Sequence, residues 1–111
     1  MATFVKYLKV LYPVNISTML LDLSDKAQLR QLEAEVRKTH DLEVLVNCAG
    51  YGIHSDFLAE DIQKREDMLT VHDVAAMRLS YEALKIMKKR RHGSIIHVSS
   101  LASLLAVGNN P

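Results

Sequence analysis

Two short apolar runs separated by a long helical pattern constrain the fold of this 111-residue chain more than any other feature. The runs are 42–47 (LEVLVN) and 94–100 (SIIHVSS), and a third run, 15–23 (NISTMLLDL), precedes them. Continuous apolar runs of this length are typical of strands in a parallel sheet that is covered on both faces. We therefore predict three strands within these runs, all of them parallel.

Amphipathic helical patterns alternate with the predicted strands. Residues 3–11 form a short one, and residues 25–39 form a second with apolar side chains on one face. Ser24 or Asp25 can cap the second helix, and Gln28 stands three residues after Asp25, as in an approximate capping box. The sequence therefore predicts a helix between the first two strands.

The pattern of residues 61–91 predicts one long helix between the last two strands. Whether this helix is interrupted near its start is a question that the sequence leaves open. A basic run, 88–92, closes this helix, and Gly93 stops it. We interpret the run as a solvated turn favoured by the helix dipole rather than as a nucleic-acid patch, because no aromatic residues interleave with it. The predicted apolar stripe consists of Met68, Val71, Ala75, Leu79, Leu84 and Met87.

The alternation of strands and helices predicts an α/β fold: a partial Rossmann-like, doubly wound parallel sheet of three strands with flanking helices on both faces. A net charge of +1 gives the chain no general attraction to nucleic acid or anionic membranes. No apolar run is long enough to predict a membrane span, and Lys6 and Lys9 interrupt the start as a secretory signal would not. The single cysteine, Cys48, fits a reducing cytoplasm, where we expect the protein to reside.

Small and polar residues stand where the predicted strands end: Asp22, 47–50 (NCAG) and 99–100 (SS). In parallel sheets the carboxyl ends of the strands share one edge, where ligands bind. Ala49 and Gly50 leave room there for something large and flat, although an ordinary turn uses the same residue types. A serine at position 100 can contact a ligand, but without a base nearby in the sequence we favour a cap of the following turn as its role.

These segments resemble the short-chain dehydrogenase/reductase (SDR) family. The run 20–25 (LLDLSD) resembles its third strand, 45–50 (LVNCAG) its fourth-strand NNAG motif, and 92–100 (HGSIIHVSS) the fifth strand that ends in the catalytic serine. The resemblance implies that residues 1–111 are an incomplete NAD(P)-binding Rossmann-like domain. The parent enzyme would move a hydride between NAD or NADP and a small-molecule carbonyl or secondary alcohol.

The resemblance also assigns individual residues. Ser100 matches the catalytic serine, and His72 stands where the family has a catalytic asparagine, although a histidine of the helix face is the alternative. Cys48 has no evident base in the sequence, so we interpret it as a small residue facing the cofactor rather than as a nucleophile. The histidines show no metal-ligand spacing, and we predict no metal site. The implied cofactor-binding residues are Asp22, Leu23, Asn47, Cys48, Ala49 and Gly50.

Two family motifs have no counterpart in these residues. No glycine precedes Gly50, so the glycine-rich TGxxxGxG turn that holds the pyrophosphate is absent, and the YxxxK motif would begin beyond Pro111. We therefore expect a central fragment that binds the cofactor weakly or not at all and is inactive alone. The alternatives are a truncation product without a role, or a non-catalytic module that joins a second copy or a full-length relative through helix 61–91.

Overall fold

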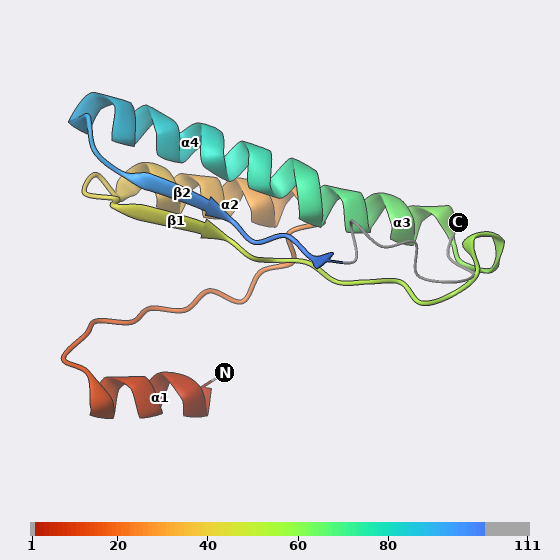
Figure 1. The fold of residues 1–111 in the computed structure, drawn as a ribbon, viewed down its shortest axis with the longest axis horizontal. Coiled ribbons are helices and arrows are strands. Elements are labelled where there is room, and N and C mark those ends of the chain that lie inside the picture. The colour runs from red at the N-terminus through yellow and green to blue at the C-terminus, as the bar shows by residue number, and fades with distance from the viewer. Residues whose placement is uncertain (1, 102–111) are drawn as a thin grey trace.

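The computed structural model describes residues 2–101, in which two helices precede the first strand and a long interrupted helix joins the first strand to the second (Figure 1). A 3-10 turn, η1 (Phe57–Ala59), precedes the long helix, and a π-helical segment, η2 (Thr70–Val74), interrupts it. The helices are α1 (Ala2–Leu11), α2 (Lys26–Lys38), α3 (Ile62–Leu69) and α4 (Ala75–Arg90), and the strands are β1 (Val44–Asn47) and β2 (Ser94–His97). No helix in this part of the chain is both long enough and apolar enough to cross a membrane.

Strands β1 and β2 pair in parallel, which confirms the predicted α/β arrangement. The register places Val44 beside Ser94 and Asn47 beside His97. One more backbone hydrogen bond extends the strand pairing at each end. The N–H of Ser94 donates to the carbonyl of Glu43, and the N–H of Val98 donates to the carbonyl of Asn47, both at 2.9 Å. The connection between the strands runs through the long helix, as parallel pairing requires.

The predicted strand at 15–23 is wrong. Residues 13–22 run as an irregular, drawn-out segment that joins α1 to the rest of the structure, and the sheet of the described residues has two strands instead of three (Figure 1). Leu20 is 91% exposed, and no strand lies beside it. Apolar, β-prone composition favours an extended backbone, but a strand also needs a neighbour that supplies the other half of each ladder hydrogen bond.

Only one face of this sheet is covered by helices within the described residues, whereas the sequence predicted helices on both. Helices α2 and α4 pack against each other on that face, and α1 contacts no other helix or strand of residues 2–101. On the opposite face Val44, Val46 and Ile96 are each about half exposed. The prediction assumed that continuous apolar strands imply two covers, a rule that holds for complete parallel sheets.

Helix α2 begins at its predicted cap. Oδ1 of Asp25 accepts hydrogen bonds from the N–H groups of Ala27 at 2.7 Å and Gln28 at 3.0 Å. These bonds hold the pKa of Asp25 below its usual value, because they stabilise the carboxylate. Gln28 does not complete the capping box: its Oε1 accepts from the N–H of Asp22 at 2.8 Å.

The long predicted helix is continuous from Ile62 to Arg90, and the break left open near its start is a π-helical turn. Within it the N–H of Ala75 donates to the carbonyl of Thr70, five residues back. At the other end Arg91 takes a left-handed conformation with φ of 56°, and Gly93 follows with φ of 141°. A Cβ at Gly93 would lie 2.4 Å from Cγ of Met87, so the turn needs glycine for both its conformation and its space.

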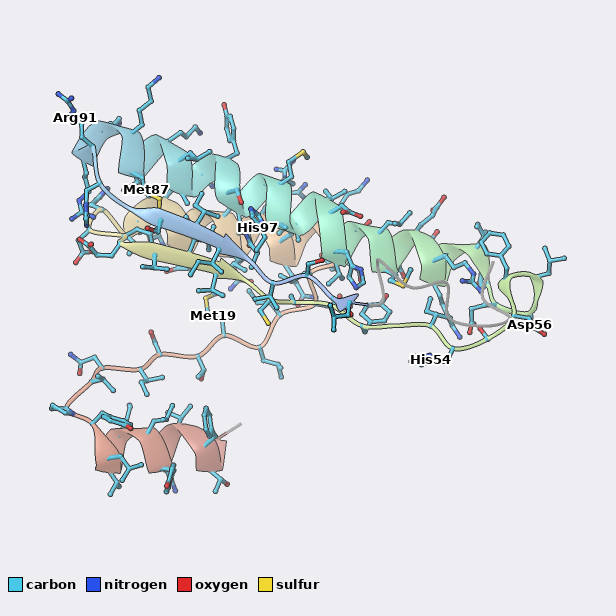
Figure 2. All side chains as sticks on the ribbon, in the orientation of Figure 1. Met19, His54, Asp56, Met87, Arg91 and His97 are labelled. Atoms are coloured by element: carbon cyan, nitrogen blue, oxygen red, sulfur yellow. The ribbon has the colours of Figure 1, made fainter. Side chains whose placement is uncertain are left out.

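The basic run at the end of α4 ties this helix to the start of β1. Nη1 of Arg90 donates to the carbonyl of Leu42 at 3.0 Å, and its Nη2 lies 2.8 Å from Oε1 of Glu43. His92 approaches the other oxygen of Glu43 at 2.7 Å, whereas Arg91 projects away from the structure (Figure 2). This geometry agrees with a solvated helix end that carries local ion pairs.

The core lies between α2, α4 and the covered face of the sheet. Leu29, Ala75 and Leu79 are almost fully buried at its centre. Met87 is also buried and lies on the side of α4 that faces the sheet (Figure 2). The half-buried side chains that pack around the centre are Leu23, Leu32, Val36 and Leu45.

The predicted partner-facing stripe of the long helix is therefore largely its inner face. Ala75 and Leu79 are 1% and 6% exposed and cannot meet another chain, whereas Leu84, which the stripe included, is 55% exposed. The exposed apolar residues of this region are Val74, Met77, Tyr81 and Leu84. Helical periodicity shows that a helix has faces, but the direction of the apolar face depends on where α2 and the sheet lie.

Candidate functional site

Both strands end at one edge, and the predicted site residues follow them there. The arrowheads of β1 and β2 point to the same end of the structure in Figure 1. Residues 48–50 leave β1 with exposed backbone and small side chains, and Ser100 lies exposed three residues past the end of β2. The structure thus brings the strand-end residues to the edge where parallel sheets bind ligands.

Asn47 joins three elements at this edge. Its Nδ2 donates to Oγ of Ser80 on α4 at 3.1 Å and lies 3.4 Å from Nδ1 of His97, its register partner on β2 (Figure 2 labels His97). Its carbonyl accepts the N–H of Val98. Asn47 is half-buried, and its side-chain amide connects the end of β1 to α4 and β2. Residues 48–50, which follow it, are exposed and remain open to a ligand.

His72 reaches the edge from η2. Its Nε2 accepts the N–H of Tyr51 at 2.9 Å, and its ring lies against Gly50. In the neutral ring the proton is then on Nδ1, because an accepting nitrogen carries none. If His72 relays a proton as predicted, only Nδ1 is available for it, because Nε2 already accepts the backbone N–H of Tyr51.

Asp22 and Leu23 lie on the segment that enters α2, and they face different surroundings. Oδ1 of Asp22 accepts from the hydroxyl of Ser24 at 2.7 Å and from its N–H at 2.9 Å. These bonds lower the pKa of the exposed Asp22 carboxyl, the hydroxyl contributing most, so it is ionised at neutral pH. Leu23 packs on the core beside Leu29. Only the exposed part of the Leu23 side chain could therefore make the predicted contact with a cofactor.

The remaining chemistry of the edge is neutral. Cys48 is a free, exposed thiol with no hydrogen-bond partner among residues 2–101, so nothing described there acts as its base. No group of three histidine, cysteine, aspartate or glutamate side chains within the described chain could hold a metal ion. Amide, hydroxyl and backbone groups at an open edge suit a polar, ring-bearing organic ligand.

Sequence reasoning missed Ser80, His97 and the amide of Tyr51. Ser80 is eight residues after His72, about two helical turns, so both lie on the same side of the long helix. His97 is the register partner of Asn47, which parallel pairing of the two runs could have suggested. The sequence thus contained indications for Ser80 and His97, but nothing in it indicated the hydrogen bond from the Tyr51 N–H to His72.

A model of the short chain dehydrogenase family matches the chain over residues 1–111. The rat (Rattus norvegicus) dehydrogenase/reductase SDR family member 6 is 34% identical over 93 residues, which cover 83% of this chain and 36% of that protein.

The chain belongs to the short-chain dehydrogenase family.

A second family member, the NADPH-dependent 1-acyldihydroxyacetone phosphate reductase of Schizosaccharomyces pombe, is 29% identical over 97 residues, 86% of this chain and 32% of that reductase. The structure of a short-chain dehydrogenase from Sphingobium yanoikuyae in complex with NADPH superposes with a TM-score of 0.87, at 20% identity, over 93% of this chain and 41% of that one. The chain thus has the α/β fold of short-chain dehydrogenases and spans about a third of the length of the curated relatives it matches.

A nicotinamide cofactor, which the family implies, fits the described residues in part. The open strand end at 48–50 can accept a flat ring, and the ionised Asp22 can accept hydroxyl donors. The described residues offer fewer groups that could bind the pyrophosphate. The N-termini of α2 and α3 are already capped by the carboxylates of Asp25 and Asp61, and two anions cannot share one helix end favourably. The described residues therefore fit the two ring-bearing ends of the cofactor better than its phosphates.

Proposed function

We propose that this chain contributes one side of the cofactor and substrate site of an oxidoreductase that transfers a hydride between NAD(P)(H) and a small-molecule carbonyl or secondary alcohol. The observation that supports this most is the shared edge of β1 and β2, where residues 48–50 and Ser100 follow two neighbouring parallel strands. In this proposal residues 48–50, Asp22 and the exposed part of Leu23 line the cofactor, and Asn47 holds that edge in place. The hydroxyl of Ser100 holds the substrate oxygen, and the cofactor supplies the hydride when bound.

The 111 residues by themselves should not turn over. Hydride transfer to a carbonyl carbon needs a proton for the oxygen, and positions 101–111 contain no tyrosine, histidine, lysine or carboxylate that could deliver it. Loss of a general acid costs about 10²–10⁴-fold in rate. The capped helix ends leave the pyrophosphate poorly bound, so we expect a millimolar dissociation constant at best, equivalent to about −4 kcal/mol.

The test combines activity with residue-level binding. NADPH and NADH are titrated into the purified chain while nicotinamide fluorescence is followed, and a panel of ketones is then added. We expect neither saturable micromolar binding nor turnover. Micromolar binding with turnover that disappears in Ser100→Ala would overturn the prediction of inactivity.

The position of the site is tested separately, by ¹⁵N-resolved NMR with millimolar NADPH. We expect the amide signals of residues 48–50 and Asp22 to move, while those of Glu43 and His92 at the opposite end of the sheet stay in place. Shifts confined to the Glu43 end would contradict the proposed site even if the chain is inactive as expected.

We infer a second candidate function, self-association through α4, from the exposed apolar residues of this helix and the cavity beside them. Val74, Met77, Tyr81 and Leu84 recur at helical spacing and are 39–63% exposed. A cavity of about 270 Å³ beside them is lined by both apolar and charged side chains: Glu33, Met77, Arg78, Tyr81 and Glu82. A two-fold contact would place the stripe of each copy over the cavity of the other, since an isologous interface uses the same patch twice.

Sedimentation at tens of micromolar tests this second function. We expect a concentration-dependent dimer that Tyr81→Glu abolishes. Leu58→Glu is the matched control, because Leu58 is 94% exposed on η1, away from the stripe. A wild-type chain that sediments as a monomer, or equal losses in both variants, would exclude α4 as the interface.

A further inference from the structure

A contact between three residues ties the long helix to the loop after β1. His72 lies in η2, the segment where the helix widens to a π turn, and its Nε2 accepts the N–H of Tyr51 at 2.9 Å. The rings of His72 and Tyr51 meet edge to face, with centroids 6.0 Å apart. A Cβ at Gly50 would lie 3.0 Å from Nε2 of His72, so glycine at this position permits the close approach.

The contact depends on the protonation of the imidazole. A ring nitrogen accepts a hydrogen bond only while it carries no proton. Once Nε2 is protonated it faces the Tyr51 N–H as a second donor, and the hydrogen bond is replaced by repulsion. Histidine is the side chain that ordinarily changes charge between pH 5 and 8, whereas the amide oxygen of a glutamine would accept the same N–H at any pH.

Few ionisable groups compete with this effect. The hydrogen bond and the ring contact of His72 are both made with Tyr51, its ring lies close to Gly50, and of these two residues only Tyr51 has a titratable side chain. On its own segment Asp73 is the adjacent residue, and within residues 2–101 no carboxylate forms an ion pair with His72. Within the described residues, no second acceptor for the Tyr51 N–H lies beside the ring.

We propose that His72 is a pH-sensitive latch for the strand-end loop. With the ring neutral, the latch holds the Gly50–Tyr51 backbone against η2 and so positions residues 48–50 at the open edge. As the pH falls and the ring gains a proton, the latch opens and this backbone detaches from the helix. His72 is thus a positioning residue, and the latch operates whether or not the edge binds a nicotinamide nucleotide.

The test uses the full 111-residue chain, labelled with ¹⁵N. Long-range spectra of the histidine rings report which nitrogen carries the proton, and the backbone signals report the loop. At pH 8 we expect the proton of His72 on Nδ1. Between pH 8 and 5 the Tyr51 amide should shift with the same midpoint as the His72 ring, and its exchange protection, corrected for intrinsic rates, should fall roughly three- to tenfold, as expected for one hydrogen bond.

Matched variants separate the latch from general acid sensitivity. His72→Gln, whose amide oxygen reaches about as far as Nε2, should keep the Tyr51 amide protected at both pH values. His54→Gln, which removes an exposed histidine of the same loop, should behave as wild type. A proton on Nε2 of His72 at pH 8 would overturn the proposal, as would a Tyr51 amide that does not follow the ring. If the position-72 variant fails to fold, the ring tautomer and the matched midpoints in the wild-type chain decide the outcome.

Discussion

Replacing Leu79 by alanine should destabilise this chain far more than the same change at Leu84, one turn or so further along α4. Leu79 is 6% exposed and packs with Leu29 and Ala75 at the centre of the core, whereas Leu84 is 55% exposed. The two substitutions remove the same atoms from the same helix. Any difference between them therefore reports burial rather than helix propensity.

The magnitude follows from how few large side chains the core contains. A buried leucine-to-alanine change costs about 2–5 kcal/mol, part of it for the cavity left behind. The neighbours Leu23, Leu32 and Leu45 are only half-buried and can partly collapse into the space, so we expect the lower half of that range, about 2–3 kcal/mol. A chain of this length at the low end of protein stability has roughly 5 kcal/mol in total, so about half would be lost. Leu84→Ala should cost about 0.5 kcal/mol or less.

Urea unfolding followed by far-UV circular dichroism measures both variants. With an m-value of about 1.5 kcal/mol per molar, the Leu79→Ala midpoint should fall by roughly 1.5–2 M, and the Leu84→Ala midpoint by about 0.3 M or less. Equal shifts would refute the argument, because the face of α4 described as its core would then be no more buried than the opposite face.

Two further predictions concern the turn after α4 and the buried carboxylate of α2. Gly93→Ala should lower the free energy of unfolding by about 1–3 kcal/mol, because its Cβ would meet Met87 at 2.4 Å in a left-handed conformation. Gly52→Ala, whose nearest neighbour is the end of the His54 side chain at 3.3 Å, should be close to neutral in the same urea unfolding experiment. Glu33 is 4% exposed and bonded by Arg78 through both oxygens, which lowers the pKa of Glu33. Its contribution to stability is therefore complete above the ordinary glutamate range and is lost as the pH falls through the lowered value, so urea midpoints of wild type and Glu33→Gln should differ at pH 7 and converge toward pH 3. Parallel curves across that range would show that the Arg78 pair contributes nothing to stability.

Local features of the fold were readable from the sequence. Asp25 caps α2 as its side chain suggested, and Gly93 stands at the turn that ends α4. Both depend on atoms within a few residues of one another, so the neighbours that decide them are specified by the local sequence. The parallel pairing of 44–47 with 94–97 was also predictable, because two continuous apolar runs joined by a long helical crossover are typical of neighbouring parallel strands.

The candidate site divides in the same way. The sequence placed Asn47 and Ser100 at strand ends, and the structure shows that both strands end at one edge. The bond of Asn47 to Ser80 and that of His72 to the Tyr51 N–H join residues 33 and 21 positions apart, and His72 lies in the π turn of the long helix. The sequence carried no signal for that turn beyond an open question about a break.

By itself, the sequence determined helix α2, the long helix from 62 to 90, the two strands and their parallel sense, and the family to which the chain belongs. Periodicity, caps and short motifs are properties of neighbouring residues. Only the tertiary structure decided which side of α4 is buried and that residues 13–22 are not a strand. It also decided that Glu33 and Glu82 are buried and paired with the half-exposed cations Arg37, Arg78 and Lys85. Each of these depends on what lies opposite in space. A helix face is buried only where another element covers it, and a strand exists only where a second backbone supplies its hydrogen bonds.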